Sequence, residues 1–231
     1  MWHPHRAGGR LRYCSIEASM RAMIDKRKIL DRFVVFEGID GTGTTTQLVR
    51  LQRRLTAAAC PHIVSCEPSR GPIGSLIRES LFGTIPLHPH TVARLFAADR
   101  GEHLYGQGGI LATTAAGMLS ISDRYLFSSL AYQGLTCGEE LPAALNAAYP
   151  LPRLLLFFDL DPEVAMRRMA GRSKLDSYEN LQFQRQVAAA YHHTIESFSE
   201  TGMELVRIDA AMEPEAVELA VWQAVEPLTK L

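Results

Sequence analysis

The sequence lacks long apolar runs and paired cysteines, and each absence excludes a class of protein. No stretch approaches the ~18 consecutive apolar residues that a membrane-spanning helix needs, so we expect no membrane partner. The four cysteines show no C-x-x-C spacing, and no signal-peptide pattern precedes them. This usage argues against a zinc site or a disulfide framework and is typical of reduced thiols in a cytoplasmic protein.

A basic majority is also absent, because the net charge is only −1 and its distribution is uneven. Residues 1–32 carry a net charge of +5, whereas residues 33–231 carry −6. Nucleic-acid binding favours a basic surface, so the acidic body argues against nucleic acid as a partner. The basic segment has two explanations, an organelle transit peptide or an upstream start codon before Met20 or Met23, and we favour the second. In either case we expect an N-terminal extension at 1–32 and one domain at 33–231.

Short apolar runs alternate with longer amphipathic stretches along this domain. Because the runs are apolar on both faces, they predict a parallel sheet covered on both sides, a three-layer α/β/α fold with five strands. Ligands bind beyond the carboxyl ends of such strands, which points to 37–46, 67–74 and 123–125. The expected strands are 33–37, 62–66, 118–122, 154–159 and 204–208, and the expected helices lie near 43–59, 73–82, 89–105, 125–136, 161–171, 179–200 and 212–229.

The first of these loops, EGIDGTGTTTQ at 37–47, follows a strand and opens a helix. It matches the phosphate-binding pattern G-x-x-x-x-G-K-[ST] except that Thr44 stands in place of the lysine. Backbone N–H groups and the helix N-terminus would bind phosphate oxygens, and the Thr45 hydroxyl would reach a nucleotide-bound Mg²⁺. The residues expected to bind ATP are Gly38, Ile39, Asp40, Gly41, Thr42, Gly43, Thr44, Thr45 and Thr46.

Two further segments carry charges suited to nucleotides. In SDRY (122–125), Asp123 can reach Mg²⁺ and Arg124 can bind a phosphate through two nitrogens. The stretch 161–176 concentrates cations around a glycine, which favours a flap, at about 167–178, that closes over a triphosphate. The cations of that stretch are Arg167, Arg168, Arg172 and Lys174.

These motifs occur in one order in a known family: FVVFEGIDGTG, EPSRGPIG, RLFAADRGEH, SDRY with SSLAYQG, and FDLDPEVAMRRMAGR with LDSYE. Over roughly 33–208 the chain therefore resembles the thymidylate kinases, P-loop enzymes that phosphorylate dTMP with ATP. The resemblance implies the fold of a P-loop nucleoside monophosphate kinase, a nucleotide-bound Mg²⁺ and a homodimer.

The resemblance also implies a base-and-sugar site. Asp40 corresponds to the acid that binds the 3′-hydroxyl of the acceptor sugar. Phe96 corresponds to the ring that stacks on thymine, and Arg100 to the guanidinium that reads the base edge. Ser129 corresponds to a small polar residue near the base. Tyr132 corresponds to the ring beneath the 2′ carbon, where a ribose hydroxyl would clash.

The phosphate contacts follow in the same way. Arg124 corresponds to the arginine that holds the acceptor phosphate, and Asp123 to the carboxylate linked to Mg²⁺. Arg70 is a second candidate phosphate contact, in the loop that also contains Glu67 and Pro68. The lid cations Arg168 and Arg172 correspond to residues that face the phosphates of ATP, and Lys174 is a further candidate to replace the missing lysine.

Thr44 is the main departure from the family pattern, because the lysine it replaces bridges the β- and γ-phosphates. Two function classes stay open at this point. The chain is an active kinase of dTMP, or of another pyrimidine monophosphate, with lid cations in place of the lysine. Alternatively it is a non-catalytic, nucleotide-binding regulatory protein.

Overall fold

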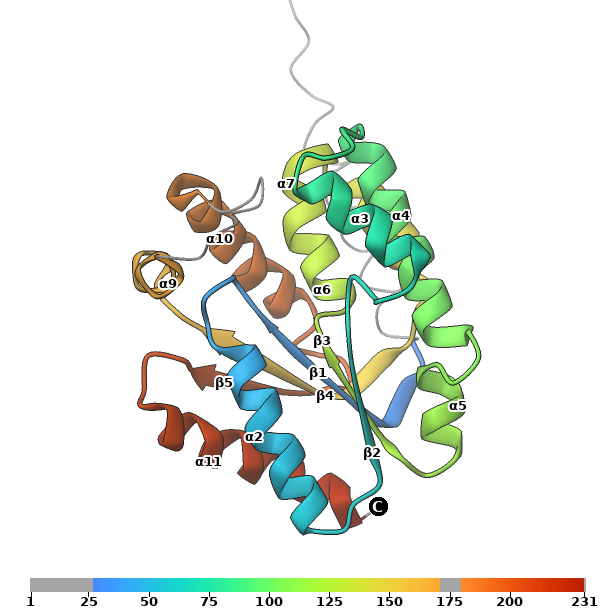
Figure 1. Ribbon diagram of the computed structural model, residues 1–231, viewed down its shortest axis with the longest axis vertical. Helices are drawn as coiled ribbons and strands as arrows, with labels where there is room; N and C mark the ends of the chain where they lie inside the picture. The colour runs from blue at the N-terminus through green and yellow to red at the C-terminus, as the bar shows by residue number, and fades with distance from the viewer. Residues whose placement is uncertain (1–26, 171–179, 231) are drawn as a thin grey trace, which may run out of the picture.

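The computed structural model describes residues 27–170 and 180–230, which form a parallel sheet between two layers of helices (Figure 1). The strand order is β2-β3-β1-β4-β5, and every neighbouring pair is parallel. This arrangement confirms the predicted three-layer α/β/α fold. The strands are β1 (Ile29–Gly38), β2 (His62–Cys66), β3 (Leu119–Asp123), β4 (Leu151–Asp159) and β5 (Glu204–Asp209).

The central strands are buried because helices cover both faces of the sheet. Residues 33–38 of β1 are all buried, which explains why this run is apolar on both faces. Strand β1 pairs with β3 so that Phe36 lies opposite Asp123. The carboxyl ends of β1 and β3 therefore bring the first and third predicted loops together.

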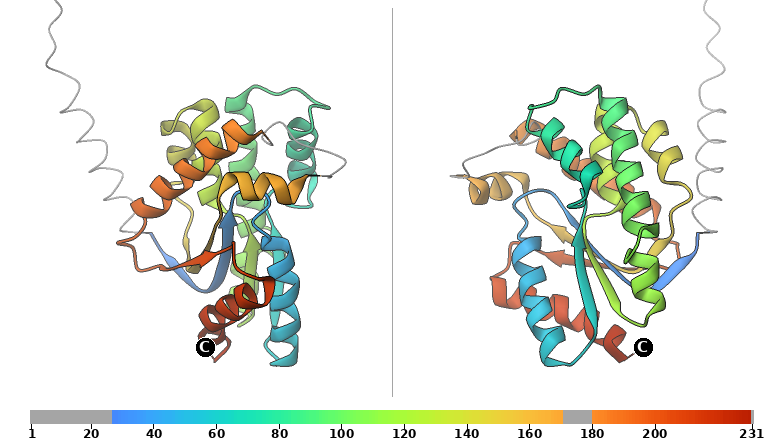
Figure 2. Two further views of the ribbon diagram at one scale, coloured as in Figure 1. Left: turned by 90° about the vertical axis from the view of Figure 1, so that its left-hand side faces the viewer. Right: turned by 45° about the vertical axis from the view of Figure 1, so that its right-hand side comes forward.

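The helices divide into two layers (Figure 2). Helices α2 and α11 contact each other and cover one face, while α4, α5, α6, α10 and the π-helix η1 lie on the other. The helices are α2 (Thr44–Ala57), α3 (Pro72–Leu81), α4 (Pro89–Tyr105), α5 (Ile110–Ala115), α6 (Leu126–Ser128), η1 (Ser129–Gln133), α7 (Gly134–Cys137), α8 (Glu140–Asn146), α9 (Pro162–Met169), α10 (Leu181–Ser197), α11 (Pro214–Val225) and the 3₁₀ helix η2 (Glu226–Lys230).

The structure differs from the expected elements in three places. Strand β1 begins at Ile29, so the last four residues of the segment assigned to the extension belong to the sheet. The single helix expected at 125–136 contains a π-helical turn at 129–133. Helices α5 and α8 were not expected, because six or seven residues give too short a period to recognise. Across 27–170 and 180–230, no helix is long and apolar enough to cross a membrane.

Candidate functional site

The glycine-rich loop after β1 encloses a cavity at the N-terminus of α2. The cavity has a volume of about 150 Å³, and Asp123 and Arg124 from the end of β3 complete its wall. Gly43 precedes α2 with φ 90°, and Gly41 has φ 88°, both in the region that favours glycine. The structure thus brings together most of the predicted phosphate-binding residues: Ile39, Asp40, Gly41, Gly43, Thr44, Thr45, Thr46, Asp123 and Arg124.

Glu37, the residue before this loop, is completely buried and accepts four hydrogen bonds. Its Oε1 accepts from the Tyr125 amide at 2.8 Å and from the amide and hydroxyl of Ser128 at 3.2 Å. Its Oε2 accepts from the Tyr191 hydroxyl at 2.8 Å. Burial raises the pKa of Glu37 to about 7, although the nearby Arg124 opposes that rise. The carboxylate fixes the turn that carries the third loop.

Arg124 lies between that turn and the glycine-rich loop. Its φ of 71° is rare for a non-glycine residue. Its Nη2 pairs with Asp40 Oδ1 at 2.6 Å, its Nη1 donates to the Tyr191 hydroxyl at 3.1 Å, and its guanidinium lies 5.2 Å from the Tyr132 ring centroid. The Tyr132 hydroxyl donates to Asp40 Oδ2 at 3.1 Å. Three residues assigned separately to phosphate, sugar and 2′ carbon therefore form one connected group.

Asp123 and the threonines of the loop have the chemistry of a Mg²⁺ site. Burial raises the pKa of Asp123, and a hydrogen bond from the Thr44 hydroxyl opposes that rise. A partly desolvated carboxylate gains from a nearby cation, and Mg²⁺ binds through one or two carboxylates together with substrate phosphates. Residues 27–170 and 180–230 contain no group of three His, Cys, Asp or Glu suited to a metal. The two residues predicted to contact Mg²⁺, Asp123 and Thr45, both line the cavity.

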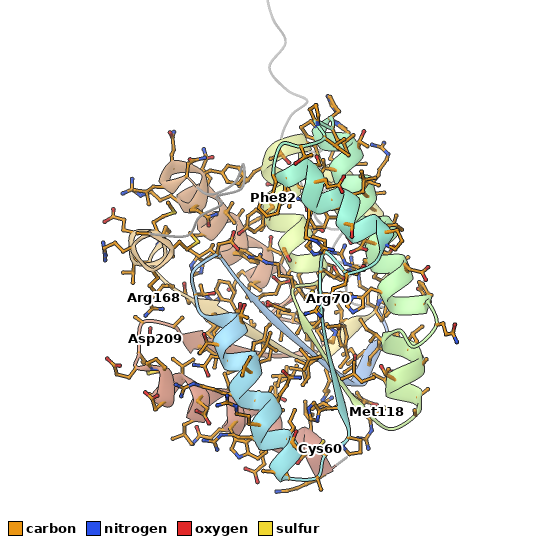
Figure 3. The ribbon with its side chains drawn as sticks, in the orientation of Figure 1. Cys60, Arg70, Phe82, Met118, Arg168 and Asp209 are labelled. Atoms are coloured by element: carbon orange, nitrogen blue, oxygen red, sulfur yellow. The ribbon has the colours of Figure 1, made fainter. Side chains whose placement is uncertain are left out.

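The second loop, between β2 and α3, is held against α4 by hydrogen bonds. Asp99 accepts hydrogen bonds from the amide and the hydroxyl of Ser69, both at 2.6 Å. A Cβ added to Gly74 would lie 1.9 Å from the Ser69 carbonyl oxygen, so only glycine allows this approach. Arg70 is exposed in the loop between β2 and α3, and in the view of Figure 3 it lies on the other side of the glycine-rich loop from Arg168.

Arg100 is fully buried and its guanidinium is held on several sides. Its Nη2 pairs with Glu67 Oε2 at 2.6 Å and donates to Ser129 Oγ at 3.0 Å, while its Nη1 donates to Asn146 Oδ1. The other carboxylate oxygen of Glu67 lies 3.0 Å from His103 Nδ1. The Arg100 Nε has no hydrogen-bond partner among the described residues. The predicted base-reading arginine therefore lies in a buried polar cluster, in which three of its five N–H groups donate to Glu67, Ser129 and Asn146.

Phe96 lies one helical turn before Arg100 on α4 and is partly exposed. Residues four apart share a helix face, so Phe96 and Arg100 lie on the same face of α4. The Tyr149 hydroxyl caps the same turn by donating to the Ala97 carbonyl at 2.5 Å.

The lid cations are only partly described. Arg168, near the end of α9, is exposed and donates to the Ala210 carbonyl at 2.9 Å. It does not line the cavity at the glycine-rich loop. The other two cations predicted for this role, Arg172 and Lys174, lie outside the described residues.

Sequence reasoning missed several members of this site. Tyr191 lies on α10, far along the chain from Arg124, and no local pattern connects the two residues. Asn146 lies on α8, which was not expected as a helix. His103 was visible in the quoted motif RLFAADRGEH, one turn after Arg100, and this spacing was the available signal.

The sequence of the chain matches one family profile and is similar to three named relatives. A family profile described as thymidylate kinase matches residues 36–221. A Treponema pallidum protein provisionally named a thymidylate kinase is 40% identical over 192 residues, covering 82% of this chain and 92% of its own length. Proteins named thymidylate kinase from Thermomicrobium roseum and Carboxydothermus hydrogenoformans are each 35% identical, over 207 and 168 residues. These matches cover 86% and 69% of this chain, and 96% and 82% of the relatives.

Proposed function

This chain belongs to the thymidylate kinase family, which transfers the γ-phosphoryl group of ATP to dTMP, and we propose how its residues carry that reaction. The function is phosphorylation of dTMP to dTDP, a step in dTTP synthesis. The acceptor phosphate oxygen attacks the γ-phosphorus in line, the bond to the β-phosphate oxygen breaks, and ADP leaves. Catalysis then consists of positioning and charge neutralisation.

The single observation that carries this proposal is the location of Arg124. Its guanidinium lies beside Asp40, the loop residue assigned to the acceptor sugar, and it lines the cavity formed by the glycine-rich loop. A cation at this junction is suited to bind an acceptor phosphate facing a donor triphosphate. Arg70, exposed at the second loop, supplies the second acceptor contact.

The base site uses Phe96 and Arg100. Stacking on Phe96 accepts any base, so discrimination depends on the donors of Arg100, which face a base carbonyl. Ser129 lies at 3.0 Å from Arg100 and completes the polar edge of this site. Tyr132 favours deoxyribose, because its ring would clash with a 2′-hydroxyl.

The lid cations replace the charge that Thr44 does not supply. A charge-assisted hydrogen bond contributes about 1.5–3 kcal/mol, which in a barrier corresponds to roughly one to two decades of rate. Arginines inserted into such sites are worth on the order of 10³–10⁵ in rate, so lid cations can offset the loss. We assign this role to Arg172 and Lys174. Arg168 would have to leave its bond with Ala210 to join them.

Three further properties belong to the proposal. The donor binds as its Mg²⁺ complex, with the ion held by Asp123, Thr45 and the phosphates, and the ion neutralises phosphate charge when bound. The protein acts as a homodimer. It works in the cytoplasm, as its cysteine usage favours.

The experiment is a coupled assay of ADP release with ATP, Mg²⁺ and dTMP, using protein that starts at Met23. We expect dTMP-dependent turnover, and a faster reaction with dTMP than with its ribose analogue. Other pyrimidine monophosphates are tested in parallel as alternative acceptors. If no acceptor gives a rate above background while ATP still binds, the regulatory nucleotide-binding alternative replaces the kinase.

A further inference from the structure

Glu37 is buried at the centre of the site, yet the proposed reaction gives it no role. Such a carboxylate is costly to bury, and nothing in its position at the end of β1 requires a charge. Its four hydrogen bonds go to the turn that carries Arg124 and to the Tyr191 hydroxyl. Both sets of contacts connect Glu37 to Arg124, one through the backbone of the turn and the other through the Tyr191 hydroxyl.

The Tyr191 route has a fixed direction. A guanidinium only donates hydrogen bonds and an ionised carboxylate only accepts them. When Glu37 is ionised, the Tyr191 oxygen therefore accepts from Arg124 Nη1 at 3.1 Å, and its proton points to Glu37 Oε2 at 2.8 Å. Tyr191 is fully buried, so water does not compete for either bond.

The second corner of the guanidinium is held by Asp40 Oδ1 at 2.6 Å. A guanidinium carries five N–H donors. The contacts at two corners fix the plane of the Arg124 guanidinium and leave other donors for phosphate oxygens. The Asp40 contact lies in the proposed acceptor site itself, at the wall of the cavity. The Tyr191 contact lies behind the guanidinium, on α10, and does not involve a residue assigned to substrate.

We infer that Glu37 and Tyr191 are positioning residues, which hold Arg124 in the orientation that binds the acceptor phosphate. This inference rests on the proposed function. The Glu37 carboxylate sets the turn through the amides of Tyr125 and Ser128, and it orients the side chain through the Tyr191 hydroxyl. Arg124 is therefore prepared before the acceptor arrives, and binding does not have to order it.

The test is a double-mutant cycle on Tyr191→Phe and Arg124→Ala, measured as kcat/KM for dTMP and as dTMP affinity by calorimetry. We expect Tyr191→Phe to lower kcat/KM for dTMP about tenfold, the size of one hydrogen bond to a charged group, with KM for ATP unchanged. In the Arg124→Ala background the same substitution should cost less than twofold. Glu37→Gln should cause a similar loss of kcat/KM for dTMP, because the NH₂ group of the glutamine amide cannot accept a hydrogen bond.

Tyr125→Phe is the matched control, since it removes an equally buried hydroxyl that donates to the Pro150 carbonyl. It keeps the amide that Glu37 binds and the ring beside Arg100, so it should lower kcat/KM for dTMP clearly less than Tyr191→Phe does, and by the same factor with and without Arg124. Equal losses from Tyr191→Phe in both backgrounds, or no loss in the wild-type background, would overturn the inference while the kinase activity stood. If wild-type protein binds dTMP without turnover, the kinase proposal fails and the calorimetric cycle still decides the positioning role. Failure of wild-type protein to bind dTMP would overturn both.

Discussion

The acceptor half and the donor half of the site are built differently. On the acceptor side, Arg100 and Glu67 are almost completely buried, and each contacts several polar partners. On the donor side, Thr45 and Thr46 are exposed and Arg168 makes one bond to a backbone carbonyl. The charged groups of the acceptor half are held by buried partners, whereas two of the three cations proposed for the donor half, Arg172 and Lys174, lie outside the described residues.

This difference indicates where selectivity and turnover are determined. Rigid, buried donors discriminate well, because a wrong ligand leaves them unpaired. Exposed hydroxyls and backbone amides bind any polyphosphate. We therefore expect substitutions in the acceptor half to affect folding and acceptor choice together, and substitutions in the donor half to affect mainly the rate.

The largest expected effect comes from breaking the buried pair. Arg100→Met removes the guanidinium that pairs with the buried Glu67 carboxylate, and we expect it to lower the free energy of unfolding by about 3–5 kcal/mol. Arg168→Ala, on the donor side, should lower it by less than about 1 kcal/mol. Urea denaturation of the two variants measures the contrast. Comparable losses would remove the distinction between the halves.

The double variant Arg100→Met with Glu67→Gln is the control for this effect. It removes the stranded charge, so it should recover part of the lost stability without recovering dTMP affinity. If it is as unstable as the single variant, lost packing and not the buried charge explains the result.

The next effect is the pH dependence of stability that the buried Glu37 carboxyl produces. Its pKa rises from 4.5 to about 7 in the folded protein. The folded state therefore binds the proton more tightly, and the stability contributed by Glu37 is present below pH 4.5 and lost as the pH rises through 7. We expect a loss of about 2–3 kcal/mol between pH 5 and 8 from this residue. Glu37→Gln should flatten that part of the profile, and an unchanged slope would assign the pH dependence to other groups.

The smallest effect is expected at the donor half. Thr44→Lys should raise kcat by about one decade, because a lysine there contributes a charge-assisted contact to the β- and γ-phosphates. It should also reduce the loss caused by Arg172→Ala, since both cations would serve the same phosphates. Thr46→Lys, two positions along α2, is the control and should not raise kcat. A lower kcat in Thr44→Lys would indicate that the Thr44 bond to Asp123 matters more than the missing charge.

Most of the fold was predictable because it depends on local sequence. The apolar runs predict all five strands, and four of the expected helices begin and end within about two residues of the observed bounds. The expected burial on both faces holds for the central strands β1, β3 and β4, but it is wrong for the edge strands β2 and β5, which are mostly partly or fully exposed. The strand order was not predicted, since it depends on which helix crosses which face. The start of β1 at Ile29 was missed because Asp31 and Arg32 interrupt the apolar run.

The site divides in the same way. Asp40, Arg124 and Arg100 were predicted because each lies inside a short sequence motif, at a set distance along the chain from the other residues of that motif. The residues behind them, Tyr191 and Asn146, reach the site from distant helices, and only the packed fold brings them near. The residues proposed to touch a ligand carry a local sequence pattern, whereas those proposed to orient them come together only through three-dimensional packing.

One close contact limits how the donor half can be redesigned. A Cβ added to Gly41 would lie 2.5 Å from the Ala165 carbonyl oxygen on α9, the helix that leads toward residues 171–179. Backbone therefore touches backbone between the two parts, with no side chain to yield. A phosphate loop transplanted from another kinase must keep glycine here, or α9 will be pushed outward. The glycine-rich loop and α9 should accordingly be exchanged together.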